Sequence, residues 1–362
     1  MKHSLKLYGT LGPACCHKDT LKQMLLAGMT GIRLNLSHKK LSECRDWLTA
    51  YQEAAEDLHM VPELLADLQG PELRIGNLSR PVDLKADMEV ILTPDGMETD
   101  PGQDGRKESI PAADDPCVTI PCPSILFPHF HEGMRLKLND GKILLEISHV
   151  SEKADSAAGK VIIPGELSSR KSIAAEQLSL PLPILTDQDR ETLTQLKHCR
   201  VTGVMLPFVR SSHDLITLKK ELHEAGMDYI RIFAKLETRE GLDRLPDLLP
   251  YCDEIIIARG DLGNAIPLPK LPGIQKKVSS ACLRARRPFM VVTQMLASME
   301  HSPVPTRAEV TDIFQAVLDG ASSLMLTGET AIGDYPVEAM KMLRETAEEA
   351  LRFRMESRFI PL

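Results

Sequence analysis

The sequence predicts an α/β protein, a (β/α)8 TIM barrel with a small inserted β domain after the third strand. Two regularities in the 362 residues and one interruption point to this fold. Short apolar runs of strand length recur eight times along the chain. Helical patterns follow most of these runs, and eight alternating strands and helices close such a barrel. One connection, after the third run, is much longer than the others.

The expected strands are continuous apolar runs rather than alternating ones. Continuous runs are typical of strands buried on both faces of a parallel sheet, which is what a barrel of this kind requires. The eight runs are Leu5–Gly9, Gly31–Asn35, Glu63–Leu68, Val201–Leu206, Ile230–Lys235, Glu254–Arg259, Phe289–Thr293 and Ser323–Thr327.

Capping motifs indicate where two of the helices begin. Thr306 is a good N-cap, and Glu309 three residues later completes a capping box. Apolar residues then recur at helical spacing until Gly320. Thr186 and Asp189 repeat the box ahead of another apolar stripe. These signals place helices between the expected strands.

The long connection between the third and fourth strands predicts a separate domain. It runs from residue 69 to residue 200, which is far too long for a loop. It is rich in Pro, Gly and Asp and contains short β-like runs such as Arg135–Leu138 and Ile143–Ile147. Asn139-Asp140-Gly141 between them is typical of a hairpin turn. The expected domains are residues 1–70 and 171–362 for the barrel and 71–170 for a β-rich lid.

Composition disfavours some binding partners and indicates the cellular compartment of the protein. The net charge of −8 disfavours a nucleic-acid-binding surface, which needs a basic footprint. The first residues lack the apolar stretch of a signal peptide, and no segment reaches the length of a membrane span. Eight cysteines occur without a C-x-x-C pair, which favours free thiols in a reducing compartment. We therefore expect a cytoplasmic protein without nucleic-acid or membrane partners.

Charged residues gather where the expected strands end, which is where barrels of this kind carry their chemistry. Glu237 and Asp261 end neighbouring strands, and two carboxylates beside water and substrate oxygens can hold Mg²⁺. Lys235 lies two residues before Glu237 and points to the same side of an extended strand. A cation beside a metal suits charge developing on a phosphoryl group or an enolate. Ordinary ion pairs between these residues are the alternative interpretation.

Two further groups of polar residues occur at the same strand ends. Asn35, Ser37 and Asp67 supply oxygen atoms from two adjacent strands. They suit either a monovalent cation or a simple hydrogen-bonded cluster. Gly260 next to Asp261 lets backbone amides approach an anion closely.

The motifs at these strand ends resemble those of the pyruvate kinase family. The resemblance runs in the family's order from about residue 5 to residue 350. The matching segments are Thr10–Ala14, Arg33–His38, Asp67–Arg74, Ala258–Gly263, Thr293–Leu296, Pro305–Glu309, Leu326–Thr330 and Gly333–Pro336. The resemblance implies a glycolytic, ATP-binding and metal-dependent kinase that transfers phosphate between phosphoenolpyruvate and ADP, giving pyruvate and ATP.

The resemblance also implies roles for single residues around the transferred phosphate. Glu237 and Asp261 would hold Mg²⁺ or Mn²⁺. Lys235 would stabilise the phosphoryl group and the enolate oxygen, and Arg33 and Arg74 would bind phosphates.

Other implied roles concern proton transfer, the carboxylate of the substrate and the nucleotide. Thr293 would belong to the proton relay that reaches the enolate carbon. The backbone around Gly260 and Asp261 would receive the carboxylate. Lys171 and His38, together with Arg74, would lie on the nucleotide side.

A potassium site is implied by the same resemblance. Asn35, Ser37 and Asp67 match the family's potassium ligands, and the carbonyl group of Leu68 would complete them. Glu72 matches the acid found in potassium-dependent members.

Two of the departures of the sequence from the family bear most on its function. Ser172–Gln177 (SIAAEQ) replaces the family's G-V-N-L-P-G, so the phosphoenolpyruvate half of the site is better supported than the ADP half. The resemblance does not extend into the family's C-terminal regulatory domain, so we expect a form without it and a homo-oligomer of undetermined size. A divergent enolate enzyme, such as a kinase for another acid or a 2-oxo acid lyase, and a non-catalytic relative remain as alternatives.

Overall fold

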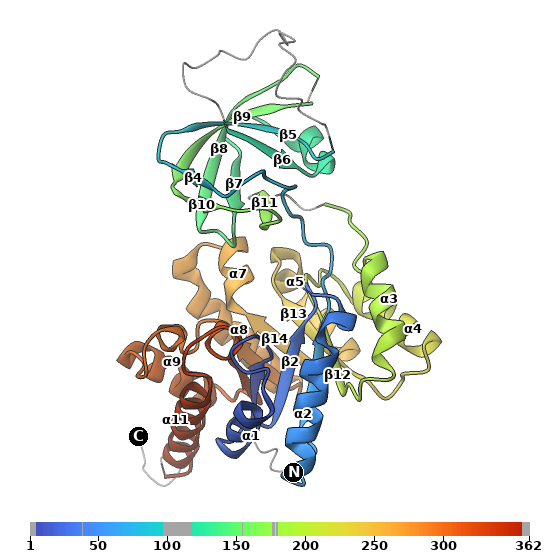
Figure 1. The fold of residues 1–362 in the computed structure, drawn as a ribbon, viewed down its shortest axis with the longest axis vertical. Helices are drawn as coiled ribbons and strands as arrows, with labels where there is room; N and C mark the ends of the chain where they lie inside the picture. The colour runs from blue at the N-terminus through green and yellow to red at the C-terminus, as the bar shows by residue number, and fades with distance from the viewer. Residues whose placement is uncertain are drawn as a thin grey trace. The chain divides into compact units, whose positions relative to one another are not determined.

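The chain folds into two compact units, a barrel unit of Met1–Pro71 with Pro183–Leu362 and a small unit of Glu72–Leu182 (Figure 1). The small unit ends at Leu182 rather than near residue 170, because β11 (Ile173–Ala175) pairs with a strand of that unit. The computed structural model describes residues 5–37, 39–96, 118–153, 155–175, 178 and 180–356.

The barrel unit confirms the predicted (β/α)8 fold. Eight parallel strands close a barrel in the order β1-β16-β15-β14-β13-β12-β3-β2. They are β1 (Lys6–Thr10), β2 (Gly31–Asn35), β3 (Glu63–Asp67), β12 (Gly203–Leu206), β13 (Arg231–Leu236), β14 (Glu254–Ala258), β15 (Phe289–Val292) and β16 (Ser323–Met325). Each strand lies within two residues of its expected position.

Large side chains fill the inside of the barrel. Tyr8 and Phe233 are fully buried there, packed with methionines such as Met205 and Met290. Gly203 makes room for the ring of Phe233, since a Cβ atom at this position would lie 2.5 Å from it. A second and larger core lies between the strands and the outer helices. Strands buried on both faces explain why their sequences are continuous apolar runs.

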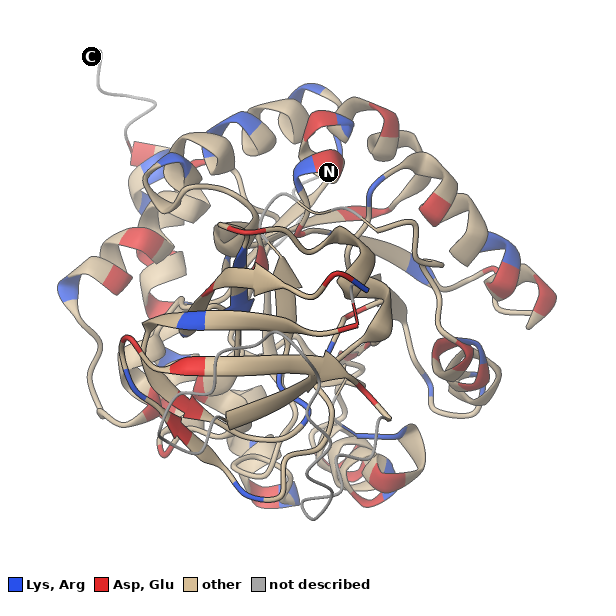
Figure 2. Cartoon of the chain, turned by 90° about the horizontal axis from the view of Figure 1, so that it is seen from above, with Lys and Arg blue, Asp and Glu red and all other residues tan. Residues whose placement is uncertain are grey.

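The outer helices of the barrel unit begin and end at the expected signals. The capping boxes of Thr306 with Glu309 and of Thr186 with Asp189 are both formed. The helices are α1 (Lys18–Leu26), α2 (Arg45–Asp57), α3 (Asp187–Leu196), α4 (Ser212–Glu224), α5 (Arg239–Asp243), α6 (Leu245–Leu248), α7 (Arg259–Ala265), α8 (Leu271–Arg284), α9 (Arg307–Leu318), α10 (Gly328–Ala331) and α11 (Pro336–Glu356). Figure 2 shows acidic and basic residues spread around this ring of helices. None of the helices within the described ranges combines the length and hydropathy that crossing a membrane requires.

The small unit is a β structure with its own core. A six-stranded sheet in the order β11-β7-β8-β9-β5-β6 is accompanied by the pair β10-β4. Asn139, Asp140 and Gly141 all have positive φ angles and form the predicted hairpin turn between β7 and β8. The remaining strands of the unit are β4 (Val82–Leu84), β5 (Glu89–Pro94), β6 (Val118–Cys122), β7 (Arg135–Leu138), β8 (Ile143–Val150), β9 (Ala157–Ile163) and β10 (Gly165–Leu167).

An ionic cluster lies at the amino ends of the barrel strands. The carboxylate of Glu63, the first residue of β3, accepts hydrogen bonds from Lys6, from the hydroxyl group of Tyr8 and from Arg231. Burial alone would raise the pKa of Glu63, but these partners outweigh it and the pKa is lowered. Charge at this end of a barrel supports stability rather than chemistry.

Glu254, the first residue of β14, is a second acid at this end and lacks such compensation. Its side chain is 4% exposed and accepts a hydrogen bond from the hydroxyl group of Ser323. Burial raises its pKa to about 7, against an ordinary value of 4.5. The hydrogen bond from Ser323 and the charges of Arg231 and Lys6 lower the pKa, but burial outweighs them. Between about pH 4.5 and pH 7, Glu254 is therefore protonated to a greater extent in the folded protein than in the unfolded chain.

We expect Glu254 to make the protein less stable as the pH rises from about 4.5 to about 7. The unfolded chain ionises first in this window, so the stability conferred by the protonated acid is lost progressively. Glu254→Gln removes the titration, and above pH 7 it should be more stable than the wild type by on the order of 3 kcal/mol. Urea unfolding at pH 5 and pH 8 measures this difference, with the exposed Glu349→Gln as control. Identical pH dependence in the wild type and Glu254→Gln would contradict it.

Candidate active site

A buried ionic cluster lies at the carboxyl ends of β2, β3 and β13. Asp67 ends β3 and is 1% exposed. Its Oδ2 atom accepts hydrogen bonds from Arg33 Nε at 2.7 Å and Lys235 Nζ at 3.2 Å. Arg33 Nη2 is 2.6 Å from the same oxygen. One carboxylate oxygen thus holds both cations that were predicted to act on phosphate.

Glu237 joins this cluster from the residue after β13. Lys235 Nζ lies 2.9 Å from Glu237 Oε1, in an ion pair whose angles fall outside hydrogen-bond geometry. Glu237 Oε2 accepts a hydrogen bond of 2.8 Å from the backbone N–H of Phe208. Lys235 and Glu237 point to the same side of the chain, as their spacing predicted. The ion pair of the alternative interpretation is therefore present, and it leaves Glu237 Oε1 without a hydrogen bond.

Negative charge exceeds positive charge at the centre of the cluster. Burial would lower the pKa of Lys235, but Asp67 and Glu237 outweigh it and the pKa is raised. Burial also raises the pKa of Glu237, and the charges of Asp261 and Asp67 raise it further against the opposing effect of Lys235. Three carboxylates thus act on one another around Lys235 and Arg33. Such crowding is relieved when a cation binds.

The oxygen atoms of the cluster fit a divalent cation. Of the predicted divalent-metal ligands, Glu237 has a buried oxygen atom, Oε1, without a hydrogen-bond partner. Asp261 lies in the first turn of α7, which follows the neighbouring strand β14. In the part of the chain that the structure describes, no group of three or more His, Cys, Asp or Glu side chains is arranged for a metal. Mg²⁺ needs only one or two carboxylates when substrate and water supply the other oxygens.

The predicted potassium ligands lie close together. Asn35 and Asp67 are paired residues in the β2–β3 ladder. Asn35 Oδ1 accepts hydrogen bonds from the hydroxyl and backbone N–H groups of Ser37, at 2.8 Å and 3.2 Å. Leu68 follows Asp67 directly, and its N–H group donates to the carbonyl of Met205 at 3.1 Å. Asn35 and Ser37 are thus hydrogen-bonded to each other but not to Asp67, whose Oδ1 atom has no hydrogen-bond partner and suits a monovalent cation.

Thr293 and Gly260 bring the next two strand ends together. Thr293 follows β15 and has a φ angle of 76°, which is unusual for a β-branched residue. A Cβ atom added to Gly260 would lie 2.9 Å from Thr293 Cγ2, so the threonine side chain rests against the first turn of α7. The close approach requires glycine at residue 260. Thr293 and Asp261 therefore flank the same short segment of backbone.

The predicted residues of the nucleotide side belong to the small unit or lie outside the described part of the chain. Arg74 pairs with Glu72, and its Nη1 atom donates to the carbonyl of Arg170 at 2.9 Å. Lys171 is the next residue, and its carbonyl group accepts from the N–H of Ile75 at 2.9 Å. Arg74 and Lys171 are thus neighbours within this unit. His38 lies outside the described residues.

Two buried carboxylates have roles at the strand ends that the sequence did not predict. The carboxylate of Asp189 accepts from the N–H groups of Gln69 and Gly70, at 2.9 Å and 3.1 Å, in addition to its role in a helix cap. Glu329 accepts from the N–H groups of Leu296 and Thr327, at 3.0 Å and 2.7 Å. Each carboxylate fixes a loop that follows a barrel strand. Only their burial could have singled them out, and the sequence does not show it.

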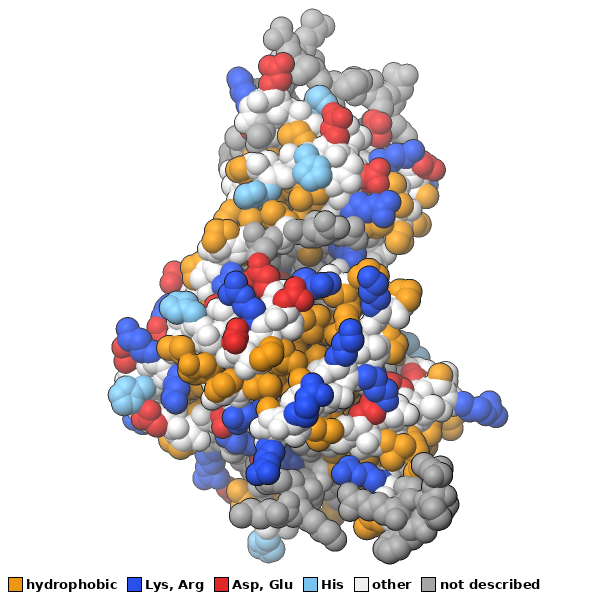
Figure 3. Space-filling model, turned by 180° about the vertical axis from the view of Figure 1, so that it is seen from behind, with side chains coloured by type: hydrophobic (Ala, Val, Ile, Leu, Met, Phe, Trp, Pro, Cys, Tyr) orange, Lys and Arg blue, Asp and Glu red, His pale blue; other side chains and the backbone are white. Residues whose placement is uncertain are grey.

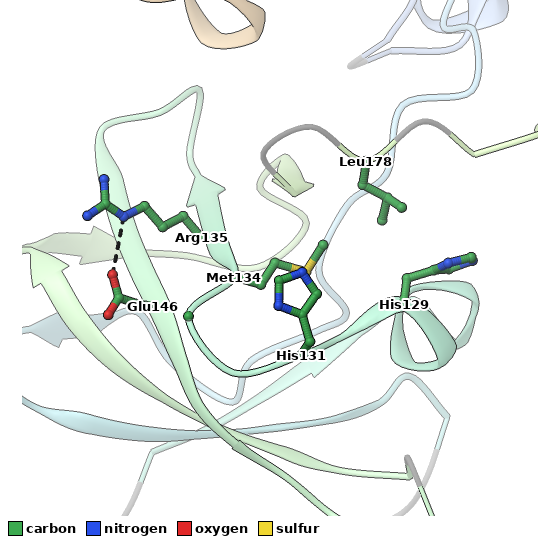
Figure 4. Close-up of a pocket in the computed structure, with 7 residues that line it drawn as sticks. His129, His131, Met134, Arg135, Glu146 and Leu178 are labelled. Carbon is green, nitrogen blue, oxygen red and sulfur yellow. Dashed lines mark hydrogen bonds and ion pairs between the residues drawn. The ribbon is translucent and has the colours of Figure 1, made fainter.

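A separate cavity of about 660 Å³ lies in the small unit (Figure 4). Its lining includes His129, His131 and the ion pair of Arg135 with Glu146. It contains none of the predicted site residues.

Comparison with known proteins identifies the family. The model of the pyruvate kinase barrel domain matches residues 2–340. A pyruvate kinase of Geobacillus stearothermophilus is 33% identical over 98% of this chain and 58% of its own length. Pyruvate kinase 2 of a Synechocystis strain is 35% identical over 95% of this chain and 56% of its own length. A pyruvate kinase of Thermococcus litoralis is 34% identical over 97% of this chain and 70% of its own length.

The chain thus spans little more than half the length of two of these relatives. The match nevertheless covers both compact units and every barrel strand. This chain belongs to the pyruvate kinase family.

Proposed function

We propose that the protein transfers a phosphoryl group between phosphoenolpyruvate and ADP, giving pyruvate and ATP. The observation that carries this proposal is the buried Lys235, which is ion-paired with Asp67 and Glu237, while one oxygen atom of each carboxylate has no hydrogen bond. Relatives called pyruvate kinase match nearly the whole chain. A buried polar atom without a hydrogen bond is costly, so two such oxygen atoms at the ends of barrel strands support a site that binds a ligand.

The residues of the cluster divide the work of charge stabilisation. Glu237 and Asp261 would hold Mg²⁺ or Mn²⁺, which supplies positive charge against the phosphate and enolate oxygens. Lys235 donates hydrogen bonds to the transferring phosphoryl group and then to the enolate oxygen. Arg33 binds the phosphate. Asp67 fixes the positions of the Arg33 and Lys235 side chains. Groups held in place before the reaction stabilise developing charge without reorganising.

Substrate positioning and proton transfer fall to the loops after β14 and β15. The backbone around Gly260 and Asp261 receives the carboxylate of phosphoenolpyruvate. The hydroxyl group of Thr293, which lies against Gly260, passes a proton to the enolate carbon. A hydroxyl group fits this task because it donates and accepts a proton.

The remaining assignments concern potassium, the nucleotide and the assembly. Asn35, Ser37, Asp67 and the carbonyl of Leu68 would hold K⁺, and Arg74 and Lys171 would bind the nucleotide with the small unit acting as a lid. His38 stays a prediction for the nucleotide side.

A homo-oligomer in the cytoplasm is part of the same proposal. Leu268 and Leu283, beside and within α8, are 68% and 54% exposed. Figure 3 shows hydrophobic side chains gathered on one face of the molecule between Lys and Arg side chains. The cysteines within the described ranges are free thiols.

Purified protein should form pyruvate from phosphoenolpyruvate and ADP, and it should do so only with a divalent cation. Coupled detection of pyruvate, with Mg²⁺ present and then chelated, measures this. Absence of turnover while oxalate still binds with Mg²⁺ would contradict the proposal. It would favour the divergent enolate enzyme instead, for which the changed segment Ser172–Gln177 is the reason.

Lys235→Met should lower turnover by about 10²-fold to 10⁴-fold, because charge on the phosphoryl and enolate oxygens loses its donor. Affinity for Mg²⁺ should change little, since Glu237 and Asp261 remain. Steady-state kinetics and Mg²⁺ titration measure the two effects, with the exposed Lys341→Met on α11 as control. Near-normal turnover of Lys235→Met would remove this residue from the mechanism.

Replacing K⁺ by tetramethylammonium should depress activity, because a bulky cation cannot approach the oxygens of Asn35 and Asp67. Ser37→Ala removes the hydroxyl group that orients Asn35, so it should raise the K⁺ concentration needed for half-maximal activity about tenfold. Initial rates over a K⁺ titration at constant ionic strength measure both effects. Equal rates in both salts would exclude the potassium site.

A further inference from the structure

Arg259 makes an unusual set of contacts beside the candidate active site. It is the first residue of α7, and its side chain is 11% exposed. Its Nε and Nη2 atoms donate to the carbonyl oxygen of Thr293, at 3.2 Å and 2.7 Å. Nη2 also lies 3.3 Å from the carbonyl of Gln294 and 3.0 Å from Met295 Sδ. One guanidinium group thus binds two consecutive carbonyl groups and a sulfur atom of the segment after β15.

The loop that Arg259 binds is strained. Thr293 and Gln294 have φ angles of 76° and 54°, in the left-handed region that side chains other than glycine disfavour. Two such residues in sequence cost of order 1–3 kcal/mol each and persist only where the surroundings enforce them. Charged donors on the carbonyl groups of Thr293 and Gln294 stabilise this conformation, because charge-assisted hydrogen bonds are stronger than neutral ones.

Contacts in both directions join the first turn of α7 to Thr293. The side chain of Arg259 reaches the carbonyl of Thr293, and the side chain of Thr293 returns to rest on Gly260. Backbone and side chain of the threonine are therefore both fixed against the first turn of α7. The guanidinium group of Arg259 is therefore linked through the Thr293 carbonyl to the residue that carries the hydroxyl group.

Asp312 anchors the guanidinium from a third element. It lies on α9, and its Oδ2 atom is 2.5 Å from Arg259 Nη1. Its side chain is 34% exposed, so the ion pair is partly screened by solvent. The bond occupies the side of the fork that does not face the loop, which leaves Nε and Nη2 for the carbonyl groups.

We propose that Arg259 is a positioning residue that holds Thr293 in its strained conformation, and that Asp312 fixes the guanidinium. The role extends the proposed function, because it acts through the hydroxyl group to which proton transfer is assigned. In the proposed mechanism, the Arg259 side chain contacts neither the substrate nor the carboxylate oxygens that would hold the metal. We call Arg259, Asp312 and the Thr293 carbonyl the arginine clamp.

The first test compares turnover in three variants of the clamp. Arg259→Met should lower kcat about 100-fold, since small displacements of a reacting group cost that much. The KM for phosphoenolpyruvate should change far less than kcat, because Arg33 and Lys235 are untouched. Arg259→Lys should be intermediate, as it keeps a charge for Asp312 but not the fork. Asp312→Asn should lower kcat about tenfold. The exposed Arg352→Met on α11 is the matched control.

The second test asks whether Arg259 acts through Thr293. In a Thr293→Ala background, Arg259→Met should reduce kcat less than threefold further, since the group it positions is already absent. Exchange of the C3 protons of pyruvate with water reports proton transfer without phosphoryl transfer, and it should fall in parallel with kcat. Full additivity of the two substitutions, or near-normal kcat in Arg259→Met, would overturn the proposal.

A substrate-free measurement separates this proposal from the proposed function. Hydrogen exchange of residues 293–296 should be faster in Arg259→Lys and Asp312→Asn than in the wild type, while exchange in α11 stays unchanged. Unchanged exchange in residues 293–296 would overturn the clamp even in an active enzyme. Wild-type protein without pyruvate-forming activity would instead overturn the proposed function, and the exchange data would still decide the clamp. If Arg259→Met fails to fold, Asp312→Asn and Arg259→Lys still test the proposal.

Discussion

The buried carboxylate of Asp67 is the contact on which the candidate site depends. It lies at the end of β3 and holds Arg33 from one neighbouring strand and Lys235 from a strand beyond the other neighbour. Two cations this close would repel each other and would be costly to bury without a common partner. The Oδ2 atom of Asp67 is a partner for both cations and so reduces both costs. Its other oxygen atom, Oδ1, has no hydrogen-bond partner. The arrangement of charge around it follows from this sharing.

The two ends of the barrel treat buried charge in different ways. At the amino ends, Glu63 has three donors and its pKa is lowered. At the carboxyl ends, Glu237 keeps an oxygen without a hydrogen bond and its pKa is raised. Glu254, also at the amino ends, has a raised pKa as well, so a raised pKa is not confined to one end. What distinguishes the carboxyl ends is that Asp67, Glu237 and Asp261 act on one another around Lys235 and Arg33. This gathering of charge supports the proposed phosphoryl transfer.

Precise placement of the reacting groups comes from residues that touch no substrate in the proposed mechanism. Asp189, Glu329 and Asp312 each bind a loop or a cation that follows a barrel strand. Their carboxylates fix backbone N–H groups or a guanidinium group rather than a ligand. Loops that carry chemistry are inherently mobile, so such fixation is what allows a hydroxyl group like that of Thr293 to be positioned.

The sequence by itself determined the barrel, since continuous apolar runs and capping boxes depend only on local order and burial. It also placed Lys235, Glu237 and Asp67 at strand ends, because parallel strands bring their carboxyl ends to one rim. It could not show that a single oxygen of Asp67 serves two cations, or that Arg259 reaches back to the Thr293 carbonyl. Those contacts join residues 34 to 168 positions apart, and only the closed barrel brings such residues together.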